Sequence, residues 1–150
     1  MKRFQFRLQR VLDLRRQQAD LERAQLRKLL TACERVEQDI RALDTALQEA
    51  RAHVRHAPSS AGEDYIALSY FESHVQRRTA TLEARRLQLQ RQVAEQRTRL
   101  LEAERKLKLL ENLEARRRSE WTVERDKELE TLGAESHLAR LQSYRRHSVV

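Results

Sequence analysis

Apolar residues recur at alternating steps of three and four along residues 26–54. They are Leu26, Leu29, Cys33, Val36, Ile40, Leu43, Leu47, Ala50 and Val54. The mean step of about 3.5 residues is typical of a left-handed coiled coil. Most of the residues in between are Arg, Lys, Glu, Asp or Gln. A helix with one narrow apolar stripe needs a partner, so the pattern predicts a second helix packed along the first.

A second repeat of the same kind follows in the other half of the chain. Its positions are Tyr65, Leu68, Glu72, Val75, Thr79, Leu82, Arg86, Leu89, Val93, Gln96, Leu100, Ala103, Leu107, Leu110, Glu114, Arg117 and Trp121. Between the two repeats lie the sole proline, Pro58, and one of the two glycines, Gly62. Proline disfavours helix at the residue before it, and a short connection joins antiparallel helices. The sequence therefore predicts an all-α fold, an antiparallel coiled-coil hairpin of two long helices.

We expect helix one at about residues 4–56, a bend at 57–63, helix two at about 64–140 and a frayed tail to 150. Together they would form a single coiled-coil rod over residues 1–150. We expect residues of the two helices to face each other where their numbers add to about 122. Leu47 then faces Val75 and Ile40 faces Leu82, so that large apolar side chains lie opposite each other. This register makes the second helix the longer one, so residues from 122 onward project past the first. Gly133 would end or kink that projection.

The composition is that of long helices. Of 150 residues, 36% are charged and 39% hydrophobic, with two glycines and one proline. A two-helix rod has no interior for a ligand pocket, and the chain lacks a phosphate-binding loop and a nucleophile elbow. His53 and His56 lack a further ligand for a metal ion. We expect no enzyme activity, no catalytic residues, no cofactor, no metal and no small-molecule substrate.

The net charge of +8 comes from 31 basic and 23 acidic residues. Such a mixed surface is mostly a solvated helix face, but its basic excess favours an acidic protein surface, nucleic acid or anionic lipid as partner. The densest basic runs are Arg116–Arg118 and Arg145–Arg146. Aromatics spaced for single-stranded nucleic acid are missing. Nucleic acid is not the expected partner, although a basic helical nucleic-acid-binding protein remains the alternative from another class.

Other features point to the reducing cytoplasm. The single cysteine, Cys33, excludes an internal disulfide, and its place in the repeat suggests a small buried apolar residue. The start Met1-Lys2-Arg3-Phe4 is basic but no long apolar run follows, so we expect neither a signal peptide nor a membrane span.

The first turns are apolar almost all round, with Phe4, Phe6, Leu8, Val11, Leu12 and Leu14. One interpretation is that the helix start is frayed and that these side chains pack over it. The other is a tip that inserts into a partner, since exposed apolar surface often marks an interface. Both stay open at this point.

Residues 4–15 (FQFRLQRVLDLR) resemble the opening of the flagellar export proteins of the FliJ family. Residues 103–118 (AERKLKLLENLEARRR) and 124–130 (ERDKELE) are similar to that family's second helix. The resemblance implies a cytoplasmic component of the flagellar type III export apparatus, peripherally associated with the inner face of the cell membrane at the flagellar base and serving motility and chemotaxis. The equivalent stalk of a virulence type III secretion system is the close alternative.

The resemblance also implies partners and contact residues. Family members form a non-catalytic two-helix stalk that docks in the hexameric export ATPase, contacts the cytoplasmic domain of the export gate and escorts export chaperones. Carried onto this chain, the ATPase-docking residues are Phe4, Phe6, Leu8, Leu110, Leu113 and Arg117. The gate contacts are Leu43 and Phe71. Some relatives carry tyrosines on the first helix where this chain has Ala46 and Ala50.

Overall fold

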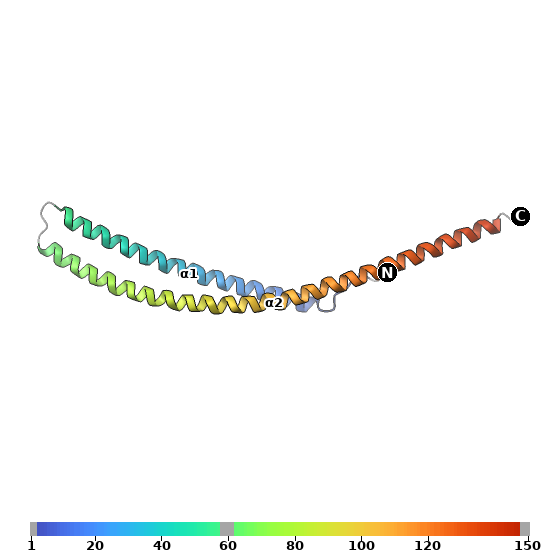
Figure 1. The fold of residues 1–150 in the computed structure, drawn as a ribbon, viewed down its shortest axis with the longest axis horizontal. Helices are drawn as coiled ribbons and strands as arrows, with labels where there is room; N and C mark the ends of the chain where they lie inside the picture. The colour runs from blue at the N-terminus through green and yellow to red at the C-terminus, as the bar shows by residue number, and fades with distance from the viewer. Residues whose placement is uncertain (1–2, 58–61, 148–150) are drawn as a thin grey trace. The chain divides into compact units, whose positions relative to one another are not determined.

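The computed structural model describes residues 3–57 and 62–147, with side chains as far as residue 143. Two helices account for almost all of them (Figure 1): α1 covers Gln9–His56 and α2 covers Gly62–His147. They have 48 and 86 residues, pack against each other and run in opposite directions. The predicted all-α hairpin with a longer second helix is confirmed.

Contacts within the chain fall into two compact units. The hairpin unit is Gln18–Ala103, and the terminal unit joins Met1–Gln17 to Glu104–Val150. Each unit takes one part of α1 and one part of α2. The single rod over residues 1–150 stays a prediction.

The predicted repeats form the core of the hairpin unit. Every residue of the 26–54 repeat is buried or half-buried. Val36, Leu82 and Leu89 make the most buried cluster, and Cys33, Ile40 and Leu43 are among the residues packed against it. In α2 the repeat is buried at Val75, Leu82, Leu89, Val93, Gln96 and Ala103. Tyr65, the first position expected in the second repeat, is instead exposed.

Polar contacts across the hairpin unit fix the pairing of the helices. The side chain of Gln96 is buried, and its Nε2 donates to the main-chain oxygen of Glu22 at 3.1 Å and to the carboxylate of Glu22. Arg51 Nε donates to Glu72 Oε1 at 2.7 Å. In both pairs the two residue numbers add to nearly 122, the sum expected for facing residues. A buried polar residue in an apolar seam specifies register, because slippage would leave it unsatisfied.

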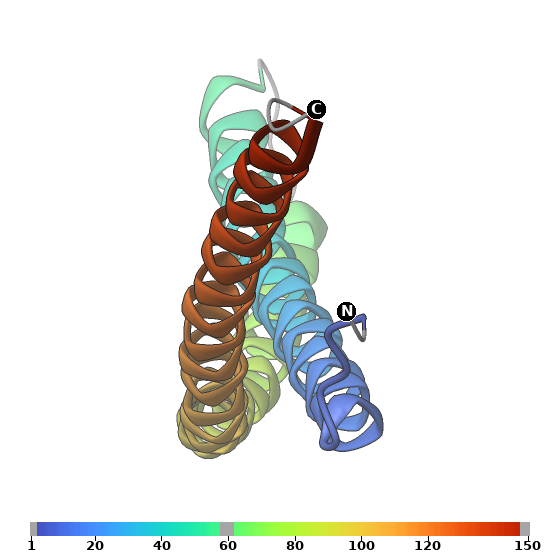
Figure 2. The same ribbon diagram turned by 90° about the vertical axis from the view of Figure 1, so that its right-hand side faces the viewer.

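At the amino end, α1 starts later than predicted. Residues 3–6 are not helical, residues 7–8 form a turn, and α1 begins at Gln9 (Figure 2). The amide of Gln9 donates to the oxygen of Phe6 at 3.1 Å. The expected start near residue 4 is therefore corrected. The segment before α1 instead makes a long-range contact, because the ring of Phe4 packs on Trp121 of α2.

The carboxyl end of α2 also differs from expectation. The helix runs through Gly133 to His147, so Gly133 does not end it, and α2 passes the expected end near residue 140. Every side chain from residue 126 to 143 is exposed. This agrees with the predicted projection past α1. Most of the expected bend, residues 58–61, and the last part of the expected tail, residues 148–150, lie outside the described residues.

A crosslink tests the pairing of the two helices. Leu47 and Val75 line the same groove between α1 and α2. With Cys33 replaced by Ala, the pair Leu47→Cys and Val75→Cys should form a disulfide within one chain, seen by mobility on a non-reducing gel and by mass spectrometry. Leu47→Cys with Leu87→Cys is the control, because Leu87 is exposed. Crosslinks formed only between chains would contradict the hairpin.

A pair of leucines on α2 tests the burial pattern. Leu89 is 2% exposed and Leu87, two residues away, is 54% exposed. Leu89→Ala should lower the free energy of unfolding by about 2–4 kcal/mol, because it leaves a cavity in the seam. Leu87→Ala should change it by less than about 0.5 kcal/mol. Denaturation followed by circular dichroism measures both, and equal losses would show that Leu89 is not in the core.

Candidate functional site

Arginine and aromatic side chains alternate in the terminal unit. The rings of Phe4 and Trp121 lie 5.9 Å apart between centroids, tilted by 56°. Arg118 Cζ stands 5.4 Å from the centroid of Phe4, and Arg125 Cζ stands 5.4 Å from that of Trp121. We call Phe4, Arg118, Trp121 and Arg125 the aromatic clasp. A tilted ring pair contributes about 0.5–1.5 kcal/mol and an exposed cation–π contact about 0.5–1 kcal/mol.

The local structure explains how these groups meet. Arg118, Trp121 and Arg125 lie at steps of three and four along α2, so they share one face of the helix. Phe4 reaches that face from the non-helical segment before α1. The clasp therefore holds the start of the chain against a residue more than a hundred positions away.

A surface hollow of about 660 Å³ lies beside the clasp. It is lined by Arg3, Phe4, Gln5, Phe6, Arg7, Leu8, Leu113, Arg117, Glu120, Trp121 and Glu124. The lining combines aromatic and aliphatic side chains with three arginines and two glutamates. Such a surface can take an apolar side chain from a partner and pair charged groups around it.

The structure brings together five of the six predicted docking residues. Phe4, Phe6, Leu8, Leu113 and Arg117 all line this hollow. Leu110 is half-buried in the helix pair and is not among the lining residues.

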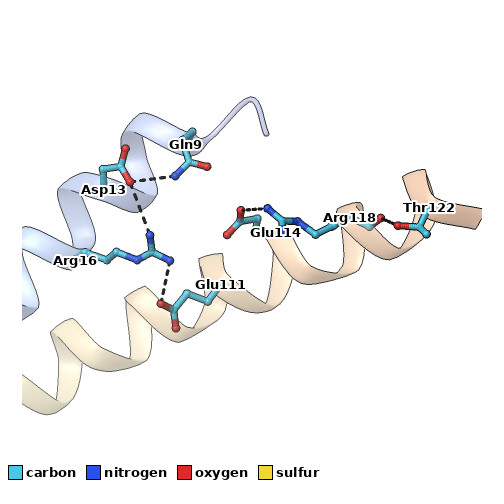
Figure 3. A network of polar contacts seen from close by, with 7 residues as sticks. All are labelled: Gln9, Asp13, Arg16, Glu111, Glu114, Arg118 and Thr122. Atoms are coloured by element: carbon cyan, nitrogen blue, oxygen red, sulfur yellow. Dashed lines mark hydrogen bonds and ion pairs between the residues drawn. The ribbon is translucent and has the colours of Figure 1, made fainter. Parts of the chain in front are cut away.

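A polar network ties α1 to α2 next to the clasp (Figure 3). Gln9 Nε2 donates to Asp13 Oδ1 at 3.0 Å, and Arg16 Nη1 lies 4.0 Å from the same oxygen. Arg16 also reaches across to Glu111 Oε1 at 3.5 Å. These side chains are about half exposed, so each ion pair contributes less than about 1 kcal/mol. Their main effect is to orient the first turns of α1 on α2.

A separate set of contacts, all within α2, positions the clasp arginine. Glu114, whose side chain is 18% exposed, lies 3.5 Å from Arg118 one turn later on α2 (Figure 3). The Thr122 hydroxyl donates to the main-chain oxygen of Arg118 at 2.8 Å. Glu114 thus limits the positions open to the guanidinium that stands over Phe4.

The two predicted gate residues do not form one patch. Leu43 packs against the core cluster of the hairpin unit. Phe71 lines a separate hollow of about 600 Å³, which Ala46 and Ala50 also line and Leu43 does not. Phe71 is therefore the better placed of the two to meet a partner.

Sequence reasoning left three clasp residues out of the docking set: Arg118, Trp121 and Arg125. The signal for Trp121 was present, because it is the last position of the second repeat and the expected register places it beside the first residues. The contacts between arginines and aromatic rings include Phe4, which lies in the non-helical segment before α1. The apolar pattern does not predict that segment.

Neither helix in the described part of the chain contains a stretch long and apolar enough to cross a membrane. Within the same residues, no three His, Cys, Asp or Glu side chains gather where they could hold a metal ion.

Comparisons with protein-family models, curated proteins and solved structures find no match to this chain. The likeness to the FliJ family rests on residues 4–15, 103–118 and 124–130. The class that the fold and the site define is a helical hairpin with an exposed surface rich in arginine and aromatic groups.

Fluorescence tests the aromatic clasp, because Trp121 is the sole tryptophan. Phe4→Ala removes the ring that covers Trp121, so its emission should shift to longer wavelength and acrylamide should quench it more strongly. Helical content should stay the same, because residue 4 precedes α1. Phe71→Ala, in the hairpin unit, is the control and should leave the emission unchanged. A Phe4→Ala variant with the parent's emission and quenching would contradict the clasp.

Proposed function

We propose that this protein is a non-catalytic stalk of the flagellar type III protein export apparatus, which docks in the hexameric export ATPase. The observation that carries the proposal is the convergence of Phe4, Phe6, Leu8, Leu113 and Arg117 on one hollow. The resemblance assigns these five residues to the docking end. The resemblance supplies the identity of the partner.

The chemistry of the hollow suits a pore with an apolar neck and acidic surroundings. Burying a phenylalanine side chain in a partner contributes about 1.5–3 kcal/mol. Arg3, Arg7 and Arg117, all lining the hollow, would face the partner's carboxylates. Glu120 and Glu124 in the same lining would make the contact dependent on orientation.

A stalk acts on a ring only if it favours some states of the ring over others. We propose that the docked end promotes assembly of the ATPase ring and so stimulates ATP hydrolysis, while this protein supplies no catalytic group. The other partners follow from the resemblance: the export gate, met through the hollow beside Phe71, and the export chaperones. In this scheme the protein works in the cytoplasm at the inner face of the membrane.

The exposed projection of α2 is a second surface that the ATPase ring could contact. Its large apolar side chains between residues 126 and 143 are Leu129, Leu132, Leu138 and Leu141. They lie on more than one side of the helix, which suits a segment surrounded by a partner better than one packed on a single helix.

Removing two aromatic rings tests the docking surface. Phe4→Ala with Phe6→Ala should reduce stimulation of the export ATPase at least tenfold, because hot-spot aromatics dominate such contacts. Motility should fall as well. The matched control is Tyr65→Ala with Tyr70→Ala, which also removes two aromatics, both exposed on α2 in the hairpin unit.

Stimulation equal to that of the parent would show that Phe4 and Phe6 do not dock. The leucines of the projection would then be the next positions to replace. Stimulation of a virulence-type ATPase and not of a flagellar one would assign the protein to the alternative secretion system.

A further inference from the structure

The middle of α2 carries most of the net charge of the chain. Residues 73–99 contain seven arginines and two glutamates, a net charge of +5, where the whole chain has +8. One of the two acids, Glu83, makes an ion pair with Arg86, with 2.6 Å between Glu83 Oε2 and Arg86 Nη2. The remaining arginines therefore meet very little compensating charge on their own helix.

Five of these arginines form what we call the arginine face. They are Arg77, Arg78, Arg85, Arg91 and Arg99, all exposed. No carboxylate makes an ion pair with any of the five within residues 3–57 and 62–143. Arg85 donates to the neutral Gln88 at 2.9 Å. Arginines near the aromatic clasp, by contrast, do have acidic partners.

The arginine face consists of two regular rows, one opposite the seam and one at its border. Arg78, Arg85 and Arg99 lie at multiples of seven residues, as do Arg77 and Arg91, so each set follows one row of the heptad. One buried row runs through Leu82 and Leu89, and the other contains Val93. At about 1.5 Å per residue, the face extends about 33 Å along α2. It lies entirely in the hairpin unit.

Two exposed leucines lie next to one of the two arginine rows. Leu87 and Leu101 occupy the heptad row next to that of Arg77 and Arg91, and both are about half exposed. Ala80 and Ala94 complete that row. Glu95 is the acid among the exposed positions of this surface between residues 77 and 101.

We propose that the arginine face binds the anionic surface of a phospholipid membrane, with α2 lying parallel to the bilayer. Arginines close to such a surface gain from the negative potential of acidic headgroups. Leu87 and Leu101 would reach between the headgroups toward the acyl chains, as in interfacial helices. Arg77 and Arg91, which make no ion pair among the described residues and lie in the row next to Leu87 and Leu101, match both parts of such a membrane surface.

A nucleic acid fits the same face less well. No Phe, Tyr or Trp occurs between residues 72 and 120, so the face offers no ring for a base to stack on. The exposed leucines would also gain little beside sugars and phosphates. This inference does not rest on ATPase docking, because the docking residues lie in the terminal unit.

Vesicle sedimentation tests the proposal with the full chain. Vesicles of phosphatidylcholine containing about one-third phosphatidylglycerol should bind the protein, and pure phosphatidylcholine should not. Replacing Arg77, Arg78, Arg85 and Arg91 with Gln should weaken binding about a hundredfold. Gln keeps high helix propensity, and circular dichroism checks that the fold is retained.

A charge-matched variant serves as the control. Replacing Arg27, Lys28, Arg35 and Arg41 of α1 with Gln removes the same four charges from exposed positions. It should weaken binding less than about threefold. Equal losses in both variants would show that overall charge, not the arginine face, attracts the vesicles. Binding to pure phosphatidylcholine, or binding to RNA but not to vesicles, would also overturn the proposal.

Discussion

The apolar seam between α1 and α2 is the interaction on which the rest of the structure depends. Each helix has one narrow stripe, and a long helix with such a stripe is stable only when a partner covers it. Val36, Leu82 and Leu89 form the most buried part of the seam. Gln96, hydrogen-bonded to Glu22, adds a polar contact that a slipped pairing would lose. The seam thus fixes which residue of α1 faces which residue of α2.

Within each unit, the pairing of α1 with α2 decides which side chains form the proposed surface. In the terminal unit it lets Phe4 reach Trp121 and gathers the predicted docking residues around one hollow. In the hairpin unit it turns the seam row of α2 inward, which leaves Arg78 and Arg85 facing solvent. The helix pair therefore presents an aromatic, mixed-charge surface in one unit and an arginine surface in the other.

Much of the fold follows from the sequence because the heptad pattern reports directly on burial within helices. The 26–54 repeat and the positions from Val75 to Ala103 are buried or half-buried in the structure as expected. The pattern fails at Phe4, which is not helical and contacts a residue far away in the chain, and at Gly133, which lies within α2. It also could not show that Leu43 belongs to the core while Phe71 faces a surface hollow. Apolar side chains look alike in a sequence, whether they fill a core or a binding surface.

The measurement that most directly tests this account is the distance between spin labels on the two helices in each unit, with Cys33 replaced by Ala. One pair sits at Thr45 and Arg77 in the hairpin unit, the other at Arg10 and Asn112 in the terminal unit; all four positions are exposed. Both pairs occupy equivalent heptad positions, so the account predicts the same single distance of about 20–35 Å for both, unchanged by dilution with unlabelled protein. Distances that differ between the pairs, or that vanish on dilution, would contradict a single register within one chain.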